Sequence, residues 1–304
     1  MRERDFIDWI RTQSRFDPAT VPVGPGDDTA VVAWKGRRTL VTVDQVLDGV
    51  HFDLARDGAA LAGRKAMARN LSDVAAMAAR PWVAVASVAL PRGADERLAR
   101  DLYTGLRGVG DEFGCPLVGG DVGSWDGKLA ISVTVLAVGD GIEPILRSGA
   151  KAGDAICVTG TLGGSWRTQR HLTFTPRVRE ARLLAQRHRP HAMIDLSDGL
   201  ATDLRHICAA SGVGARILAG DLPVSPDVST DEPREAVLRA IGDGEDYELL
   251  FTLPMGRARQ LIAQQGLPVP VSLVGRCTPG PDLVLEWPDG RHEPLPQSGW
   301  EHTT

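Results

Sequence analysis

The chain has 304 residues, of which 43% are apolar, so it is long enough for two domains of roughly 100–200 residues each and apolar enough for a proper core. Lysine and arginine number 34 and aspartate and glutamate number 39, which gives a formal net charge of −5. This mildly acidic composition, with no run of basic residues, argues against nucleic acid and anionic membranes as partners.

The N-terminus lacks the apolar segment of a secretory signal, and the longest apolar stretch, residues 82–90, is far too short to span a bilayer. The four cysteines lie 42 or more residues apart and form no CxxC pair, so neither a zinc ribbon nor a disulfide framework is indicated. We therefore expect a protein of the reducing cytoplasm that has no membrane partner.

Hydrophobic spacing in the first half predicts helices and strands that alternate along the chain. The clearest helix repeats apolar residues at near-helical spacing from Leu98 to Phe113 and ends at Gly114. The expected helices are residues 5–13, 59–79 and 98–113, and the expected strands are residues 30–34, 40–43, 82–90, 117–118 and 129–138. After the first helix the order is β-β-α-β-α-β-β, which indicates a mixed α+β unit with its helices on one face.

A polar, glycine-rich stretch from Gly139 to Asp154 marks a boundary, so we expect two domains, residues 1–142 and residues 143–304. The second half is expected to contain strands at residues 155–159, 192–194, 213–218 and 247–253 and helices at residues 178–187, 200–210 and 255–265, followed by short strands. The predicted fold class is therefore α+β, with a mixed sheet and one-sided helices in the N-terminal domain and an α/β C-terminal domain.

Aspartates recur at glycine-rich turns that follow short apolar runs. These segments are Gly26-Asp27-Asp28, Val43-Asp44, Ser72-Asp73, Gly120-Asp121, Asp195-Leu196-Ser197-Asp198 and Gly242-Asp243-Gly244. Each alone is more simply a turn, and Ser72-Asp73 and Ser197-Asp198 are alternatively helix N-caps. Six together indicate a converging group, and converging carboxylates repel one another unless cations neutralise them.

Carboxylate ligands without nearby histidine or cysteine favour a hard cation, Mg²⁺ or Mn²⁺. Mg²⁺ commonly binds through a few carboxylates together with the phosphates of a substrate, which indicates a nucleoside triphosphate. The usual phosphate-binding loops are missing, because the chain has no Walker A motif and no GxGxxG motif. The chain also has no GxSxG motif, so a covalent nucleophile of that kind is not indicated. ATP would therefore have to bind largely through metal ions.

The motifs together closely resemble the thiamine-monophosphate kinase family, within the superfamily that includes aminoimidazole ribonucleotide synthetase. The segments that carry the resemblance are Gly26–Val31, Val43-Asp44, Gly49–Phe52, Asn70–Met77, Gly119–Asp121, Arg147–Asp154, Thr159–Gly163, Met193–Leu200 and Gly244–Phe251. The resemblance covers nearly the whole chain.

This resemblance implies an N-terminal domain that pairs with its twin in a homodimer, and small-molecule substrates that bind between the two domains. ATP would be held there with several Mg²⁺ ions. The implied metal ligands are Asp28, Thr42, Asp44, Asp73, Asp121, Asp195 and Asp198. The implied ATP contacts are Tyr103, Gly120, Asp121, Arg147 and Ser197, and the implied contacts to the thiamine phosphate are His51, Glu245 and Trp300. The residues expected to carry catalysis are Asp44, Asp121 and Arg147.

Simpler structural roles remain open for three of these residues. His51 follows a strand and is alternatively a structural hydrogen-bonding group, and Arg147 alternatively pairs with Asp154. Trp300 is alternatively a packing anchor near the C-terminus, although an indole can also stack on a cationic ring.

The sequence departs from the family pattern in three places. Val43 stands where a hydroxyl residue is common, and Asp243 replaces a usual glycine. The segment from Gly164 to Arg189 is shorter than usual.

The reaction that the resemblance implies is transfer of the γ-phosphoryl group of ATP to the phosphate of thiamine monophosphate, by direct in-line attack. The acceptor needs no general base, because a phosphate monoester with a second pKa of about 6 is already anionic at neutral pH. Metal ions and Arg147 would offset the repulsion between the two anions. The alternatives are another ATP-using enzyme of the superfamily, of cyclo-ligase type, and a non-catalytic nucleotide-binding relative.

Overall fold

The computed structural model describes residues 17–24, 26–34 and 37–297, so the expected helix at residues 5–13 and the expected site residue Trp300 lie outside the described residues. The elements of the first half are β1 (Ala30–Trp34), β2 (Arg37–Leu47), α2 (Leu54–Ala76), β3 (Arg80–Pro91), α3 (Glu96–Glu112), β4 (Leu117–Trp125) and β5 (Ala130–Val138). This order confirms the predicted β-β-α-β-α-β-β succession.

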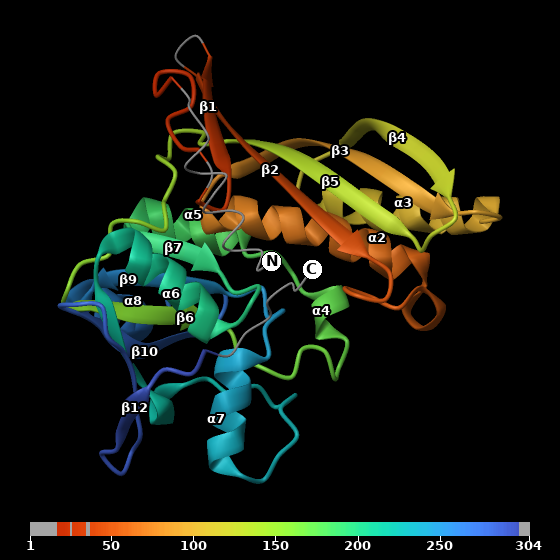
Figure 1. The fold of residues 1–304 in the computed structure, drawn as a ribbon. Coiled ribbons are helices and arrows are strands. Elements are labelled where there is room, and N and C mark those ends of the chain that lie inside the picture. The colour runs from red at the N-terminus through yellow and green to blue at the C-terminus, as the bar shows by residue number, and fades with distance from the viewer. Residues whose placement is uncertain (1–16, 25, 35–36, 298–304) are drawn as a thin grey trace.

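The first five strands form one sheet in the order β1-β2-β5-β3-β4, with only β3 and β4 parallel. Both α2 and α3 lie against one face of this sheet, as predicted (Figure 1). Side chains of β5 alternate accordingly, because Val133 and Val135 are fully buried while Ser132 and Thr134 on the opposite face are half-buried. Within the part of the chain described, no helix covers that opposite face.

Small residues let α2 and α3 pack closely. A Cβ atom at Gly105 would lie 1.9 Å from the carbonyl oxygen of Ala60, and one at Gly63 would lie 2.3 Å from that of Leu102. The alanine-rich sequence of α2 therefore serves both helix propensity and close contact. The Asp53 side chain caps this helix by accepting hydrogen bonds from the backbone N–H groups of Ala55 and Arg56.

The second half forms a seven-stranded sheet with helices packed on it. Its strands are β6 (Asp154–Thr159), β7 (Ala192–Asp195), β8 (Gly214–Leu218), β9 (Leu249–Pro254), β10 (Val271–Thr278), β11 (Leu283–Glu286) and β12 (His292–Pro294). Its α-helices are α4 (Arg170–Thr173), α5 (Val178–Arg187), α6 (Leu200–Ser211), α7 (Pro233–Gly242) and α8 (Met255–Ala263). The strand order is β12-β11-β8-β10-β6-β9-β7, and the only parallel pair among these described strands is β8 with β11.

Two predictions of local structure were incomplete. The strand β4 is much longer than the predicted residues 117–118, because pairing with β3 carries Gly119 and Gly120 through as strand rather than turn. The short helix α4 and the helix α7 were not predicted. The signal for α7 was present, because Val237, Ala240 and Ile241 are spaced for one buried face and Pro233 stands at the helix start, a common position for proline.

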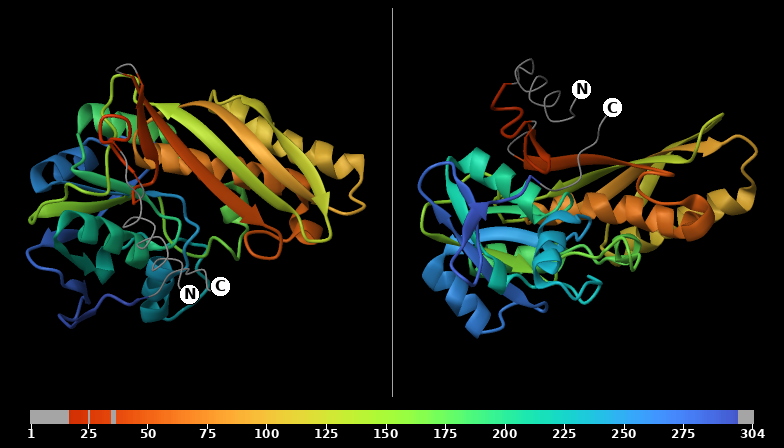
Figure 2. Two further views of the ribbon diagram at one scale, coloured as in Figure 1. Left: turned by 45° about the horizontal axis from the view of Figure 1, so that its top comes forward. Right: turned by 60° about the horizontal axis from the view of Figure 1, so that its bottom comes forward.

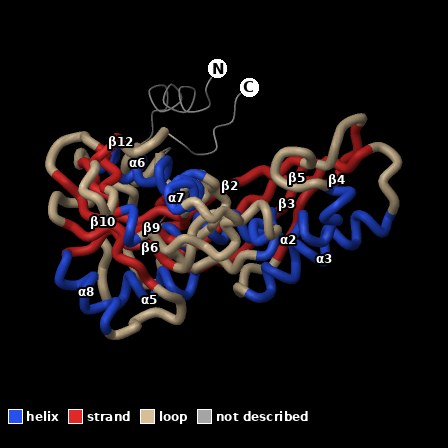
Figure 3. Tube along the Cα trace, turned by 90° about the horizontal axis from the view of Figure 1, so that it is seen from below, coloured by secondary structure: helices blue, strands red, loops and turns tan. Residues whose placement is uncertain are grey.

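The helix α2 joins the two halves of the molecule. It runs beneath the first sheet and reaches the second half, where it packs against α4, α5 and β7 (Figure 2). Phe174 and Tyr247 of the second half belong to the same buried core as α2. The two halves lie side by side, which is also seen from below (Figure 3). The domain limit at residues 142 and 143 stays a prediction, within the segment between β5 and β6.

None of the described helices is both long and apolar enough to cross a bilayer. The four cysteines are buried free thiols.

Candidate functional site

Three of the predicted metal ligands meet where the two halves join. Asp28 precedes β1, Asp73 lies on α2 and Asp195 ends β7, yet carboxylate oxygens of all three lie within 4.8 Å of one another. We call this group the Asp28–Asp73–Asp195 cluster. The Thr42 hydroxyl donates a hydrogen bond to Asp73, and the Ser72 hydroxyl donates one of 2.6 Å to Asp195. Thr42, a predicted ligand, thus borders the cluster.

Burial and mutual repulsion disfavour the charged forms of this cluster. Burial raises the pKa of Asp73 well above its ordinary value, and the charges of Asp44, Asp195 and Asp28 raise it further. Burial also raises the pKa of Asp195 to about 8, with a further contribution from Asp28. A buried group of carboxylates is costly unless a cation offsets their charge, so the arrangement fits a hard divalent cation.

Arg147 borders the same cluster. Its Nε and Nη2 atoms donate hydrogen bonds of 3.1 and 2.9 Å to the two carboxylate oxygens of Asp28. Its backbone N–H donates a hydrogen bond to the carboxylate of Asp27. Burial raises the pKa of Asp27 to about 6. The alternative pairing of Arg147 with Asp154 is wrong, because Asp154 instead pairs with Nδ1 of His191 at 2.8 Å. A guanidinium group therefore lies beside the cluster, in a position suited to bind phosphate groups that a metal ion holds there.

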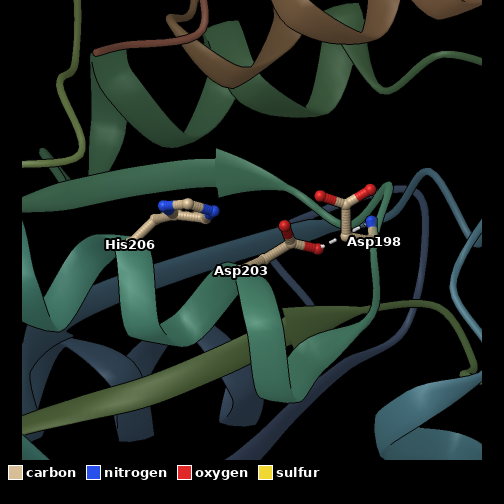
Figure 4. Close-up of side chains that lie close together, drawn as sticks. All are labelled: Asp198, Asp203 and His206. Carbon is tan, nitrogen blue, oxygen red and sulfur yellow. Dashed lines mark hydrogen bonds between the residues drawn. The ribbon is translucent and has the colours of Figure 1, made fainter. Parts of the chain in front are cut away.

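Asp198 lies in a second group, with Asp203 and His206 of α6 (Figure 4). One potential ligand atom from each of the three lies within 4.8 Å of the others. The Asp203 carboxylate accepts hydrogen bonds from the backbone N–H groups of Asp198 and Gly199, at 3.2 and 3.1 Å. Burial raises the pKa of Asp203 well above its ordinary value, and the nearby Asp198 raises it further. Sequence reasoning did not identify Asp203 or His206.

The interpretation of the two Ser-Asp pairs as helix N-caps is wrong for both. Ser72 and Asp73 lie near the end of α2, not at its start. The N-cap residue of α6 is Gly199, which has no side chain to cap with, and Asp203 holds the preceding loop instead. Ser197 lies in that loop, and its carbonyl oxygen accepts a hydrogen bond of 2.7 Å from the backbone N–H of Glu245.

Asp44 and Asp121 lie on different strands of the first sheet. Asp44 is on β2, where its Oδ2 atom lies 3.2 Å from Nε of Arg69 on α2. Asp121 is on the edge strand β4, and the strands β5 and β3 lie between β4 and β2. At an interstrand spacing of about 4.8 Å, the strands carrying Asp44 and Asp121 are separated by about 14 Å. Gly120 lies beside Asp121, so both are on that distant strand.

Tyr103 is also distant from the cluster. It lies half exposed on α3, and the nearby Gly105 of that helix packs against Ala60, which is about 20 Å along α2 from Asp73. Within one copy of the chain, the structure therefore does not bring Tyr103, Gly120 and Asp121 to the Asp28–Asp73–Asp195 cluster.

Another polar group at the junction, which we call the Lys65–Glu245 group, contains His51 and Glu245, two of the residues expected to face the thiamine phosphate. Lys65 of α2 lies between them and donates a hydrogen bond of 2.7 Å to the carbonyl oxygen of His51. It also donates to Oε2 of Glu245 and lies 2.9 Å from Nδ1 of His171. The ring of His51 accepts a backbone hydrogen bond of 3.0 Å from Leu47, so the expected structural role of His51 is present.

The opposite charges in the Lys65–Glu245 group stabilise one another. Burial by itself would raise the pKa of Glu245, but the hydrogen bond with His171 and the charges of Lys65 and Arg69 lower it to about 2. Burial lowers the pKa of Lys65 to about 8, against the opposing effect of Glu245. Glu245 is therefore a carboxylate and Lys65 predominantly an ammonium ion at pH 7.

The backbone around Glu245 is strained. Glu245 and Tyr247 have φ angles of 57° and 52°, in the left-handed region that favours glycine. Each such residue costs about 1–2 kcal/mol, and such strain gathers at functional sites. The Tyr247 hydroxyl is buried and has no hydrogen-bond partner among the described residues.

Helical spacing offers a sequence signal for Lys65 and Arg69, which sequence reasoning missed. Lys65, Arg69 and Asp73 are spaced i, i+4 and i+8 along α2, so they share one face of the helix. That face carries both polar groups at the junction. His171 could not be found in this way, because it lies in the segment that departs from the family pattern.

The structure also accounts for another departure. The Asp243 carboxylate accepts a hydrogen bond of 2.9 Å from the backbone N–H of Gly164, so it holds the glycine-rich loop after β6. Val43 lies 61% exposed, and its side chain is on the opposite face of β2 from Thr42 and Asp44.

Comparison with known proteins gives matches over most of the chain. Residues 26–139 match the family model of the AIR synthase related protein, N-terminal domain, and residues 151–288 match that of its C-terminal domain. A thiamine-monophosphate kinase of Rhodopirellula baltica is 39% identical over 285 residues, covering 90% of this chain and 89% of that protein. A thiamine-monophosphate kinase of Escherichia coli K12 is 35% identical, covering 98% of this chain and 95% of that protein.

The fold agrees with these matches. A solved structure described as AaThiL complexed with AMPPCP and TMP superposes with a TM-score of 0.84 at 29% identity. The superposition covers 99% of this chain and 97% of that one.

Proposed function

The chain belongs to the thiamine-monophosphate kinase family of AIR synthase related proteins, and from this membership we propose that it transfers the γ-phosphoryl group of ATP to thiamine monophosphate. The products would be thiamine diphosphate and ADP. The observation that carries the proposal is the Asp28–Asp73–Asp195 cluster, built from both halves of the chain with Arg147 beside it.

We expect several Mg²⁺ ions to bind at the Asp28–Asp73–Asp195 cluster. The donors are oxygen atoms, and the burial that raises the pKa values of Asp73 and Asp195 disfavours their charge in the absence of a cation. Asp28, Asp73 and Asp195 would hold such ions. Thr42 donates a hydrogen bond to Asp73, the charge of Asp44 acts on Asp73, and Asp198 follows Asp195 closely in the sequence. When bound, Mg²⁺ supplies charge neutralisation and orientation of the ATP phosphates.

Arg147 would bind the phosphates of ATP through its planar guanidinium. It is paired with Asp28 in the structure, and Asp28 keeps it oriented towards the cluster. The chain need not supply a general base, because the acceptor phosphate is already anionic. Catalysis would then consist of positioning two anions in line and offsetting their repulsion.

Glu245 and His51 would bind the thiamine part of the acceptor. Glu245 is held as a carboxylate at neutral pH, which suits a cationic thiazolium ring. Ser197 lies between the predicted metal ligands Asp195 and Asp198 in the sequence, and its carbonyl oxygen accepts a hydrogen bond from the backbone N–H of Glu245.

We also propose a homodimer formed through the uncovered face of the first sheet. Val43 on β2 and Val85 on β3 lie in one row across that face, with Thr134 of β5 between them. The two valines are 61% and 42% exposed. A second copy would cover this face. Asp121 and Tyr103, which one copy does not bring to the cluster, stay predicted contacts of ATP. The buried free thiols fit a reducing compartment such as the cytoplasm.

Mass spectrometry of the products formed from thiamine monophosphate and MgATP tests the proposal. We expect thiamine diphosphate and ADP in equal amounts. A cyclo-ligase of the superfamily would consume ATP only with another substrate, and a non-catalytic relative would leave both substrates unchanged. Asp44→Asn should abolish turnover because it removes charge from the site, whereas Asp101→Asn on the exposed surface of α3 should not.

A further inference from the structure

Lys65 connects the two residues that the proposed function assigns to the acceptor. Its Nζ atom donates to the carbonyl oxygen of His51 in the first domain and to the carboxylate of Glu245 in the second. The side chain of Lys65 is completely buried. One ammonium group thus bridges the domains at the place where thiamine phosphate is expected.

Burial of this charge has a cost that packing alone does not explain. An isolated ammonium ion is strongly disfavoured in a protein interior, and an apolar side chain of similar size would often be equally stable or more stable there. The strained backbone of Glu245, with φ at 57°, adds to the cost. The buried Lys65 ammonium and the strained Glu245 backbone are therefore costly in free energy, and together they hold Glu245 in a defined position.

The contacts to Glu245 occupy one side of its carboxylate. Lys65 donates to Oε2, and Nδ1 of His171 lies 3.6 Å from the same oxygen atom. The carboxylate is thereby fixed in orientation and kept ionised, while its second oxygen atom is not used by either partner.

An aromatic ring also lies close to Lys65. The Trp166 ring stacks on His171 with ring centroids 4.0 Å apart, and Nζ of Lys65 lies 5.0 Å from the Trp166 centroid. The Nε2 atom of His171 is buried without a hydrogen-bond partner among the described residues. Trp166 and His171 thus add an aromatic wall beside the Lys65–Glu245 pair.

We propose that Lys65 is a positioning residue that orients Glu245 towards the cationic ring of the acceptor and ties it to His51. This inference rests on the proposed function. Lys65 acts through Glu245 and not through ATP, so its loss should affect the acceptor alone. A merely structural role would instead weaken the fold and affect both substrates alike.

Lys65→Met tests this distinction, with Arg56→Met on the exposed surface of α2 as the matched control. We expect the KM for thiamine monophosphate to rise roughly tenfold or more, as for the loss of a charged hydrogen bond, while the KM for MgATP stays within about twofold. Calorimetric titration of the protein with thiamine monophosphate alone should show the same loss of affinity. Arg56→Met should change neither KM.

A double variant separates positioning from folding. If Lys65 acts through Glu245, Lys65→Met combined with Glu245→Gln should have the acceptor KM of Glu245→Gln alone. This double variant also removes the unpaired buried carboxylate, so it can be measured even where Lys65→Met does not fold.

The inference is overturned if Lys65→Met leaves the acceptor KM unchanged or raises both KM values equally. It is also overturned if the acceptor losses of the two single variants add in the double variant, or if the double variant binds the acceptor normally. Failure of the wild-type chain to phosphorylate thiamine monophosphate would instead refute the proposed function. The two failures are therefore distinguishable in one set of assays.

Discussion

Replacing Asp195 with asparagine should stabilise the metal-free protein. The Asp195 side chain is almost completely buried, and its pKa is raised from 3.8 to about 8 by burial first and by Asp28 second. Holding a carboxyl group protonated at pH 7, about three pH units above its ordinary pKa, costs about 4 kcal/mol. The asparagine side chain is neutral without that cost, and its amide oxygen could still accept the hydrogen bond from Ser72.

The expected gain is smaller than this limit, because Asp73 shares the same repulsion and can take up a proton itself. We expect Asp195→Asn to raise the free energy of unfolding by about 2 kcal/mol at pH 7 without metal. Urea unfolding followed by circular dichroism measures this change, with Asp101→Asn on the surface of α3 as the control.

The pH dependence gives the sign of the effect. A carboxyl group whose pKa is raised in the folded state contributes most to stability below its ordinary pKa, and this contribution is lost as the pH rises to about 8. The wild-type protein without metal should therefore lose stability relative to Asp195→Asn between about pH 4 and about pH 8. Mg²⁺ should stabilise the wild type, by about 2.7 kcal/mol at a concentration roughly 100 times Kd, and stabilise the variant much less. Equal stability of the two proteins at every pH, with equal stabilisation by Mg²⁺, would refute the reasoning.

Three further changes test other parts of the molecule. Arg147→Lys keeps the charge but loses the bidentate geometry, so the KM for ATP in steady-state assays should rise about tenfold or more; an unchanged value would contradict phosphate binding by this residue. Asp243→Gly removes the acceptor of the Gly164 N–H and should lower the free energy of unfolding by about 1–3 kcal/mol in urea titrations, whereas a neutral result would mean that the loop finds another partner. Val43→Asp should convert the proposed dimer to a monomer in sedimentation experiments, while Gln264→Asp on the surface of the second domain should not; a Val43→Asp dimer would place the interface elsewhere.

The sequence was informative about the local elements and the family. Alternating and near-helical apolar spacing predicted the β-β-α-β-α-β-β succession, because burial of one face requires that periodicity in any fold. The recurring Asp motifs also identified Asp28, Asp73 and Asp195, although the first and last of them are more than a hundred residues apart in the chain. Their shared chemistry was visible without coordinates, since several carboxylates at glycine-rich turns imply a common cation.

Only the tertiary structure decided which of these residues meet. It groups Asp28 with Asp73 and Asp195, sets Asp198 with Asp203 and His206, and leaves Asp121 on a distant edge strand. Distances of this kind depend on strand order and on how α2 joins the two domains, and short motifs carry no information on either. The bridge through Lys65 was hidden for the same reason, because a lysine in a helix looks like a solvent-exposed residue until the opposing domain buries it.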